Sequence, residues 1–147
     1  MSATIPEASG DRSQLGLSNE AKLDLDFIED ELRLPNRVDG YRLGVAVSLR
    51  KALEPSAQGV PRTTAYSATG TFDPDGHFRS AILAMRDDHG GRPYALAERL
   101  AEAGMRDLRS HLEGGLTLRQ YLAGLQASDE QDLQHAEPDG NSRASSA

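Results

Sequence analysis

The chain of 147 residues contains no cysteine, no tryptophan and only two lysines among its sixteen lysine and arginine residues. Without cysteine it can form no disulfide, no zinc site built from thiolates and no thiol nucleophile, which agrees with a cytoplasmic location. No apolar run reaches the roughly 18 residues of a membrane-spanning helix. The first residues have neither the basic nor the apolar region of a signal peptide. We therefore expect a cytoplasmic protein without a membrane contact.

The net charge of −7 is unevenly distributed along the chain. Residues 127–147 carry five acidic residues and one arginine, whereas residues 19–126 have a net charge of only −2. The central part is therefore close to neutral, and local groups of basic side chains decide which partners it attracts.

Composition and periodicity divide the chain into three predicted segments. Residues 1–16 are rich in serine, glycine and proline and are predicted to form a flexible N-terminal arm. Residues 17–126 are predicted to form a single helical domain, and residues 127–147 a disordered acidic tail with too little apolar surface to fold.

Most of the central segment has the apolar spacing of helices, so the predicted fold class is mainly α. Ser18 is a plausible N-cap for the first helix, Gly104 is expected to stop a helix that begins at Pro93, and Thr117 with Gln120 forms a capping box. A short extended segment or strand is expected over residues 62–72. The predicted helices cover residues 19–34, 35–53, 77–85, 93–103 and 105–112, with a last one after Thr117.

The helix predicted over residues 35–53 is apolar on two sides, which indicates a helix at the centre of its domain or one shared between subunits. Gly40 and Gly44 form a ledge of small residues on a third side. Because a glycine inside a helix costs about 0.5–1 kcal/mol relative to alanine, we expect another backbone to approach closely there.

Basic residues lie on the remaining edge of this helix and in the linker after it. An arginine side chain suits phosphate because its planar fork donates two parallel hydrogen bonds. The alternative for each of these residues is an ion pair with a carboxylate of the same chain. The candidate DNA-binding residues are Arg37, Arg42, Arg50, Lys51 and Arg62.

No pattern in the sequence indicates catalysis. There is no glycine-rich loop before Lys-Ser or Lys-Thr, no GxGxxG after a strand, and no histidine spacing typical of a metal site. We therefore expect a protein that is not an enzyme and that holds no cofactor or metal.

Four segments over about residues 17–115 carry a resemblance to a known family. They are Leu17-Ser18, Arg42-Leu43-Gly44 followed by Ser48-Leu49, Thr69-Gly70-Thr71-Phe72-Asp73, and Arg109-Ser110-His111-Leu112 leading to Gly115. In their order and spacing these segments resemble the DndE family of DNA phosphorothioation proteins. The first helix, turn and second helix also resemble a ribbon-helix-helix protein.

This resemblance implies a small, mostly helical homo-oligomer that binds duplex DNA, with a preference for nicked duplex, and is not itself an enzyme. Its partners would be a cysteine desulfurase, an iron-sulfur protein and an ATPase, which together replace a backbone oxygen by sulfur. Two alternatives remain open. One is a helical scaffold that binds other proteins of the modification or restriction complex, and the other is a ribbon-helix-helix transcriptional repressor.

Overall fold

The structure, a computed structural model, describes residues 10–126 and is mainly helical, as predicted, with a short two-stranded antiparallel sheet. The chain forms two compact units that divide after Ser110. Residues 118–126 are also helical. The labelled elements are β1 (Gln14–Leu17), α2 (Asn19–Leu32), α3 (Arg37–Lys51), β2 (Thr63–Ser67), the π-helical turn η1 (Ala68–Phe72), α4 (His77–Met85) and α5 (Pro93–Glu113).

Helix α2 begins where the sequence predicted, because the hydroxyl of Ser18 accepts a hydrogen bond of 3.1 Å from the N–H of Ala21. Ala21, Leu25 and Ile28 recur every three or four residues and form its buried side. The helix ends at Leu32, two residues before the predicted end, since the next residue takes the left-handed conformation and closes the last turn.

Residues 14–16, which the sequence placed in the flexible arm, form most of strand β1 instead. This strand pairs antiparallel with β2 of the same chain, and Leu15 lies opposite Tyr66. Leu15 and Leu17 are buried, so their apolar side chains provide the free energy that orders this end of the arm. The predicted strand over residues 62–72 is likewise shorter, because the chain turns into η1 after Ser67.

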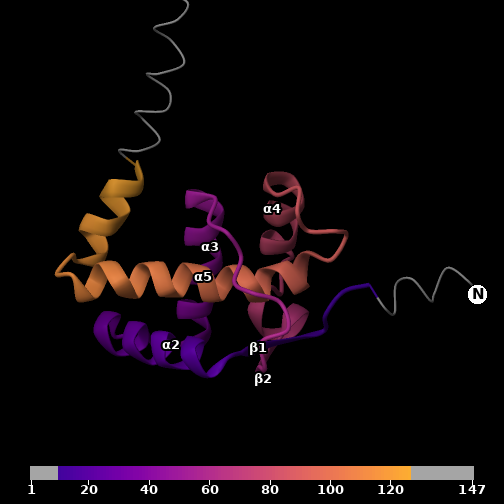
Figure 1. Cartoon of the computed structure of the whole chain (residues 1–147), viewed down its shortest axis with the longest axis horizontal. Helices are drawn as coiled ribbons and strands as arrows, with labels where there is room; N and C mark the ends of the chain where they lie inside the picture. Colours follow the sequence, from indigo (N-terminus) through magenta and orange to yellow (C-terminus); the bar gives the residue numbers. More distant parts are fainter. Residues whose placement is uncertain (1–9, 127–147) are drawn as a thin grey trace, which may run out of the picture. The chain divides into compact units, whose positions relative to one another are not determined.

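Helix α3 lies at the centre of the unit, and the backbone expected to approach its glycines belongs to α5. The two helices cross in Figure 1, with α2 beside them. A β-carbon at Gly44 would lie 2.5 Å from the carbonyl oxygen of Ala101. Gly40 differs, because the nearest atoms to its missing β-carbon belong to the side chains of Leu25 and Leu34.

The prediction that Gly104 stops a helix was wrong, because α5 continues through this position to Glu113. A β-carbon at Gly104 would overlap the backbone carbonyl group of Gly44. The glycine is therefore needed for the close crossing of α3 and α5 and not for a helix end.

Helix α4 has the predicted bounds, and the turn before it is fixed by Asp73. The carboxylate of Asp73 accepts hydrogen bonds from the N–H groups of Phe78 and Arg79 at the start of the helix. Its Oδ2 also accepts one of 2.9 Å from the hydroxyl of Tyr94 in α5. Burial and this hydrogen bond raise the pKa of Tyr94 to about 12. Asp73 thus ties α4 to the first turn of α5.

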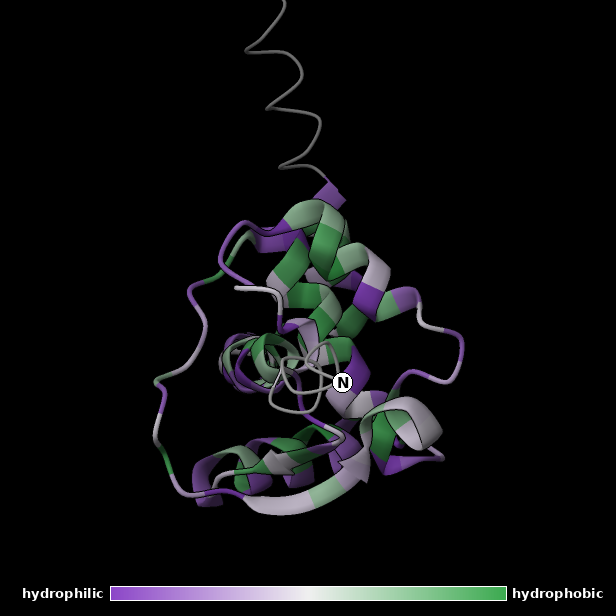
Figure 2. Cartoon of the chain, turned by 90° about the vertical axis from the view of Figure 1, so that its right-hand side faces the viewer, coloured by the Kyte–Doolittle hydropathy of each residue, from purple (hydrophilic) through white to green (hydrophobic). Residues whose placement is uncertain are grey.

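The core of the first unit lies between its helices. Figure 2 shows hydrophobic residues concentrated on these helices. Tyr41 of α3 is fully buried, and its ring meets those of Tyr66 and Phe72 edge-on at centroid distances of 5.2 and 5.6 Å. Phe72 in turn stacks on Phe78 of α4 at 4.9 Å. This row of rings joins the sheet, α3, η1 and α4.

In the second unit the predicted capping box is confirmed. The N–H of Thr117 donates to Oε1 of Gln120 at 2.9 Å, and the N–H of Gln120 donates back to the Thr117 hydroxyl at 3.1 Å. The predicted acidic tail, and residues 1–9 of the predicted arm, lie outside the described residues. Within residues 10–126, no helix is both long enough and apolar enough to cross a bilayer.

Candidate nucleic-acid interface

The first predicted DNA-binding residue, Arg37, lies in the first turn of α3 and faces α2. Its Nη1 is 2.6 Å from a carboxylate oxygen of Asp26 and 2.8 Å from one of Glu29. About a third of the Arg37 side chain is exposed, as is more than half of that of Asp26. This group is therefore an ion pair at the surface between two neighbouring helices.

Arg42 holds the turn η1 against α3. Its Nε donates to the carbonyl oxygen of Phe72 at 2.9 Å, and its Nη2 donates to that of Thr71 at 2.6 Å. The remaining nitrogen, Nη1, pairs with Asp39 one turn earlier in α3 at 2.9 Å. Because all three nitrogens bind groups of the same chain, Arg42 fixes the position of the π-helical turn.

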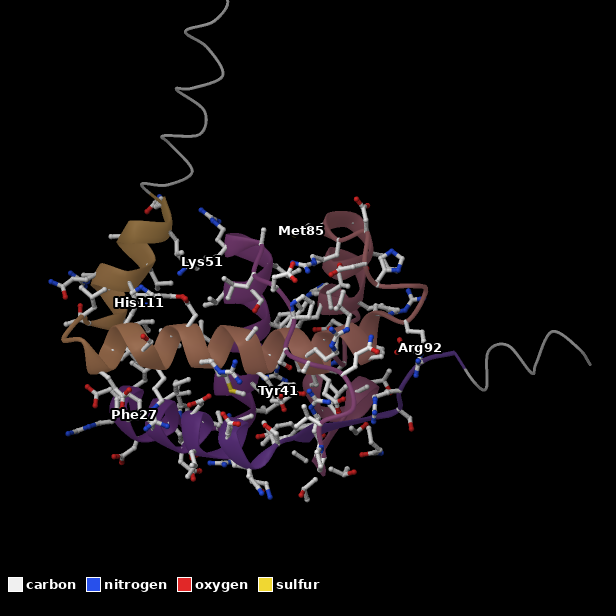
Figure 3. All side chains as sticks on the ribbon, in the orientation of Figure 1. Phe27, Tyr41, Lys51, Met85, Arg92 and His111 are labelled. Atoms are coloured by element: carbon white, nitrogen blue, oxygen red, sulfur yellow. The ribbon has the colours of Figure 1, made fainter. Side chains whose placement is uncertain are left out.

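Arg50 and Lys51 lie in the last turn of α3. Arg50 is exposed, and Lys51 is partly covered by α5, where its Nζ is 2.6 Å from the carboxylate of Asp107. Figure 3 shows Lys51 at the end of α3. Basic residues at a helix C-terminus also interact favourably with the helix dipole, so both positions have a structural reason to be basic.

Arg62, the last predicted residue, is almost completely buried between the linker and α5. Its Nε and Nη2 donate to the two carboxylate oxygens of Glu102 at 2.9 and 3.0 Å, a bidentate pair. Its Nη1 lies 3.7 Å from Oε1 of Glu98. Arg37, Arg42, Lys51 and Arg62 are therefore each paired with carboxylates of their own chain, which is the alternative left open by the sequence.

The two carboxylates that face Arg62 are the principal polar feature that sequence reasoning missed. Glu98 and Glu102 lie one turn apart on α5 and have exposed fractions of 2% and 3%. They accept hydrogen bonds from the backbone N–H groups of Gly16 and Ser18, at 2.7 and 2.9 Å. The available signal was the presence of two acidic residues four positions apart within an apolar stretch.

Glu102 is held in its charged form by this network. Burial by itself raises the pKa of the Glu102 carboxyl, but the hydrogen bonds from Arg62 and from the N–H of Ser18 outweigh burial and lower that pKa below its ordinary value. The hydroxyl of Ser56 adds a further hydrogen bond of 3.1 Å. The Glu102 carboxylate thus joins the N-cap of α2, the linker and the segment before β2 to α5.

A cavity of about 210 Å³ lies beside this network, and four arginines line it. No motif in the sequence indicated this group of arginines. It lies between the segment before β1, the linker after α3 and the first turns of α5. Figure 3 shows Arg92 at the beginning of α5, near that N-terminal segment. The lining residues are Arg12, Gln58, Gly59, Arg62, Arg92, Ala95, Leu96, Glu98 and Arg99. Among residues 10–126, no three histidine or acidic side chains are placed to hold a metal ion.

Four of the residues that carry the family resemblance lie at packing positions within the first unit. Gly44 allows the crossing with α5, Ser48 donates a hydrogen bond of 2.6 Å to the carbonyl oxygen of Leu100, and Ser18 caps α2. Arg109 pairs with Asp24 at 3.2 Å. No protein-family model matches the chain, and neither a curated protein nor a solved structure is significantly similar to it.

Proposed function

We propose that this chain is a non-enzymatic accessory subunit of a DNA phosphorothioation system that binds the backbone of duplex DNA. In this proposal the protein is a homo-oligomer and works beside a cysteine desulfurase, an iron-sulfur protein and an ATPase. The observation that carries it is the position of the residues that resemble the family. Arg42 joins α3 to η1, and Gly44 and Ser48 join α3 to α5. The resemblance therefore involves residues on which the fold depends.

The partly exposed basic residues of α3 support a contact with phosphate. Ion pairs at such positions contribute only about 0–1 kcal/mol, because water and salt screen them. A DNA phosphate can therefore replace the carboxylate beside Arg37 or Lys51 at little cost, and Arg50 extends the same helix end. Arg42 keeps two backbone carbonyl groups in place, and only its contact with Asp39 is open to exchange.

Arg62 has a different role in this proposal from the one that the sequence predicted. Its guanidinium is buried and bidentate with Glu102, so a phosphate would have to displace a desolvated carboxylate. Arg62 therefore positions the linker, and the direct contacts with DNA come from the exposed side chains.

The test is fluorescence anisotropy of a labelled duplex, titrated with protein over a range of salt concentrations. If four to six phosphates are neutralised, log affinity falls with log salt with a slope of about −4 to −5. The double variant Arg50→Ala with Lys51→Ala weakens binding and reduces that slope by about 2. Arg119→Ala, an exposed residue in the second unit, is the control and binds as the unaltered protein does. A flat salt response, or no binding at low salt, overturns the proposal.

A second candidate function is the helical scaffold for other proteins, which one specific observation favours. Leu83 and Met85 of α4 are 37% and 57% exposed, and Figure 3 shows Met85 at the end of that helix. Apolar side chains at a surface contribute binding energy when a partner covers them. The scaffold predicts that the chain co-purifies with other phosphorothioation proteins and gives no DNA shift at low salt.

The third alternative, a ribbon-helix-helix repressor, requires a strand whose side chains are free to read the major groove. β1 buries three of its four residues and pairs with β2 of its own chain. The geometry of the strand therefore favours the other two functions.

A further inference from the structure

The arginine-lined cavity contains more positive charge than its carboxylates neutralise. Four arginines and one glutamate line it. Arg62 is neutralised by Glu102 from outside the cavity, and Arg12 lies 3.4 Å from Glu98. Two positive charges remain after both carboxylates are counted, on a chain whose net charge is −7.

Within the described part of the chain, Arg92 and Arg99 form no ion pair, and each has nitrogens that bind no group. Arg99 uses its Nε to donate a hydrogen bond of 2.6 Å to the carbonyl oxygen of Ser56, which holds the linker and leaves its terminal nitrogens for a ligand. The exposed side chain of Arg92 makes neither a hydrogen bond nor an ion pair with residues 10–126. Both residues line the same cavity, so these donors are available to one ligand.

The beginning of α5 does not supply the donors, although helix N-termini often bind anions. The N–H groups of Tyr94 and Ala95 each donate 2.9 Å hydrogen bonds to the carboxylate of Asp11. An anion in the cavity would therefore be held by the guanidinium groups.

The size of the cavity limits the ligand to a small group. Pockets for drug-sized ligands measure about 300–1,000 Å³, and one water takes about 30 Å³. A volume of about 210 Å³ has room for one phosphate group with several waters. The planar fork of arginine matches two oxygens of such a group and forms charge-assisted hydrogen bonds with it.

We propose that this cavity binds a tetrahedral oxyanion of the phosphate class. Arg92 and Arg99 contact the anion directly. Arg12, paired with Glu98, and Arg62, fixed by Glu102, line the same cavity. This site consists of other residues than the proposed DNA contacts on α3. Its phosphate group can come from free phosphate or a monoester, or from a phosphodiester of DNA.

The test measures inorganic phosphate binding to the full chain by isothermal titration calorimetry, with sodium chloride at matched ionic strength as the blank. We expect a saturable isotherm with the unaltered protein and about a tenfold or greater loss of affinity in Arg92→Ala, because charge-assisted hydrogen bonds are removed. Arg92 is exposed, so its replacement leaves the fold intact. Arg92→Lys keeps the charge without the fork and binds with intermediate affinity.

Arg106→Ala is the matched control, because Arg106 is exposed on the same helix and does not line the cavity. It retains the phosphate isotherm of the unaltered protein. An absent isotherm, or equal affinities in Arg92→Ala, Arg106→Ala and the unaltered chain, overturns the proposal. Circular dichroism of each variant shows that it is folded.

A second arm identifies the source of the phosphate. If a DNA phosphodiester occupies the cavity, inorganic phosphate competes with labelled duplex, and Arg92→Ala loses affinity for DNA. If the ligand is free phosphate or a monoester, Arg92→Ala binds duplex as the unaltered protein does. A chain that binds phosphate and never binds duplex supports the cavity and overturns only the proposed DNA function.

Discussion

Gly104 of α5 lies directly against the backbone of Gly44 of α3, and this contact fixes how closely the two longest buried helices cross. A side chain on either residue would have to separate the helices. The contact lies next to the hydrogen bond from Ser48 to the carbonyl oxygen of Leu100, so the crossing is also held by a polar bond.

Replacement of Gly104 by alanine is therefore expected to destabilise the protein. Alanine improves helix propensity by about 0.5–1 kcal/mol, but overlap with the carbonyl of Gly44 costs about 1–3 kcal/mol or more. Urea denaturation monitored by circular dichroism measures the net loss. Gly124→Ala is the control, since nothing lies within 4 Å of the added carbon and residues 118–126 are helical. Equal unfolding midpoints would show that the helices can separate without cost.

The glycines also show where sequence reasoning succeeded and where it did not. The two apolar sides of residues 35–53 correctly indicated a central helix, and Gly44 was correctly linked to a close approach. At Gly104 the sequence predicts an ordinary helix end, because it does not reveal which glycines face each other in the fold. The Ser18 cap and the Thr117–Gln120 capping box are confirmed. They could be predicted because the two partners of each hydrogen bond are only three residues apart in the sequence.

Long-range polar contacts account for what could not be predicted about the site. Arg62 and Glu102 are 40 positions apart, and the Lys51–Asp107 pair spans 56. The sequence left both interpretations of each basic residue open, a contact with phosphate and an ion pair within the chain. Only the fold selects between them, and the arginines of the cavity come from three segments that have no common motif.

The hydroxyl groups of Tyr41 and Tyr66 give a matched pair of predictions. Tyr41 donates a 3.1 Å hydrogen bond to the carbonyl oxygen of Gly16, whereas the buried hydroxyl of Tyr66 has no partner within residues 10–126. Tyr41→Phe should reduce the free energy of unfolding by about 0.5–1.5 kcal/mol. Tyr66→Phe should leave it unchanged or increase it, because an unsatisfied polar group is removed. Urea denaturation measures both free energies of unfolding. A greater loss of stability in Tyr66→Phe than in Tyr41→Phe would refute this assignment.

Arg62 and Arg37 are both paired with two carboxylates, but they differ in burial. Arg62→Met leaves the buried carboxylate of Glu102 without its cation and leaves Glu98 with Arg12 alone, which is expected to cost about 3–5 kcal/mol. Arg37→Met breaks pairs at the surface and should cost about 1 kcal/mol or less. Thermal denaturation at neutral pH compares the stabilities of the two variants directly. If both lose the same small amount of stability, the Arg62 network adds no more than a surface pair.

The lowered pKa of Glu102 makes stability depend on acid pH in a defined direction. The unfolded chain binds a proton at Glu102 at a higher pH than the folded chain does. Its contribution to stability is therefore complete above the ordinary glutamate pKa of about 4.3 and is lost as pH falls through the lower folded value.

Glu102→Gln should abolish this part of the acid dependence, so that the difference in stability between variant and unaltered protein narrows as pH falls below about 4.3.

Asp24 opposes the trend, since burial outweighs its pairing with Arg109 and raises the pKa of its carboxyl. Asp24→Asn should therefore steepen the loss of stability in acid. Urea midpoints measured from neutral pH down to about pH 3 compare the three proteins, and parallel pH profiles would mean that neither carboxyl changes its proton affinity on folding.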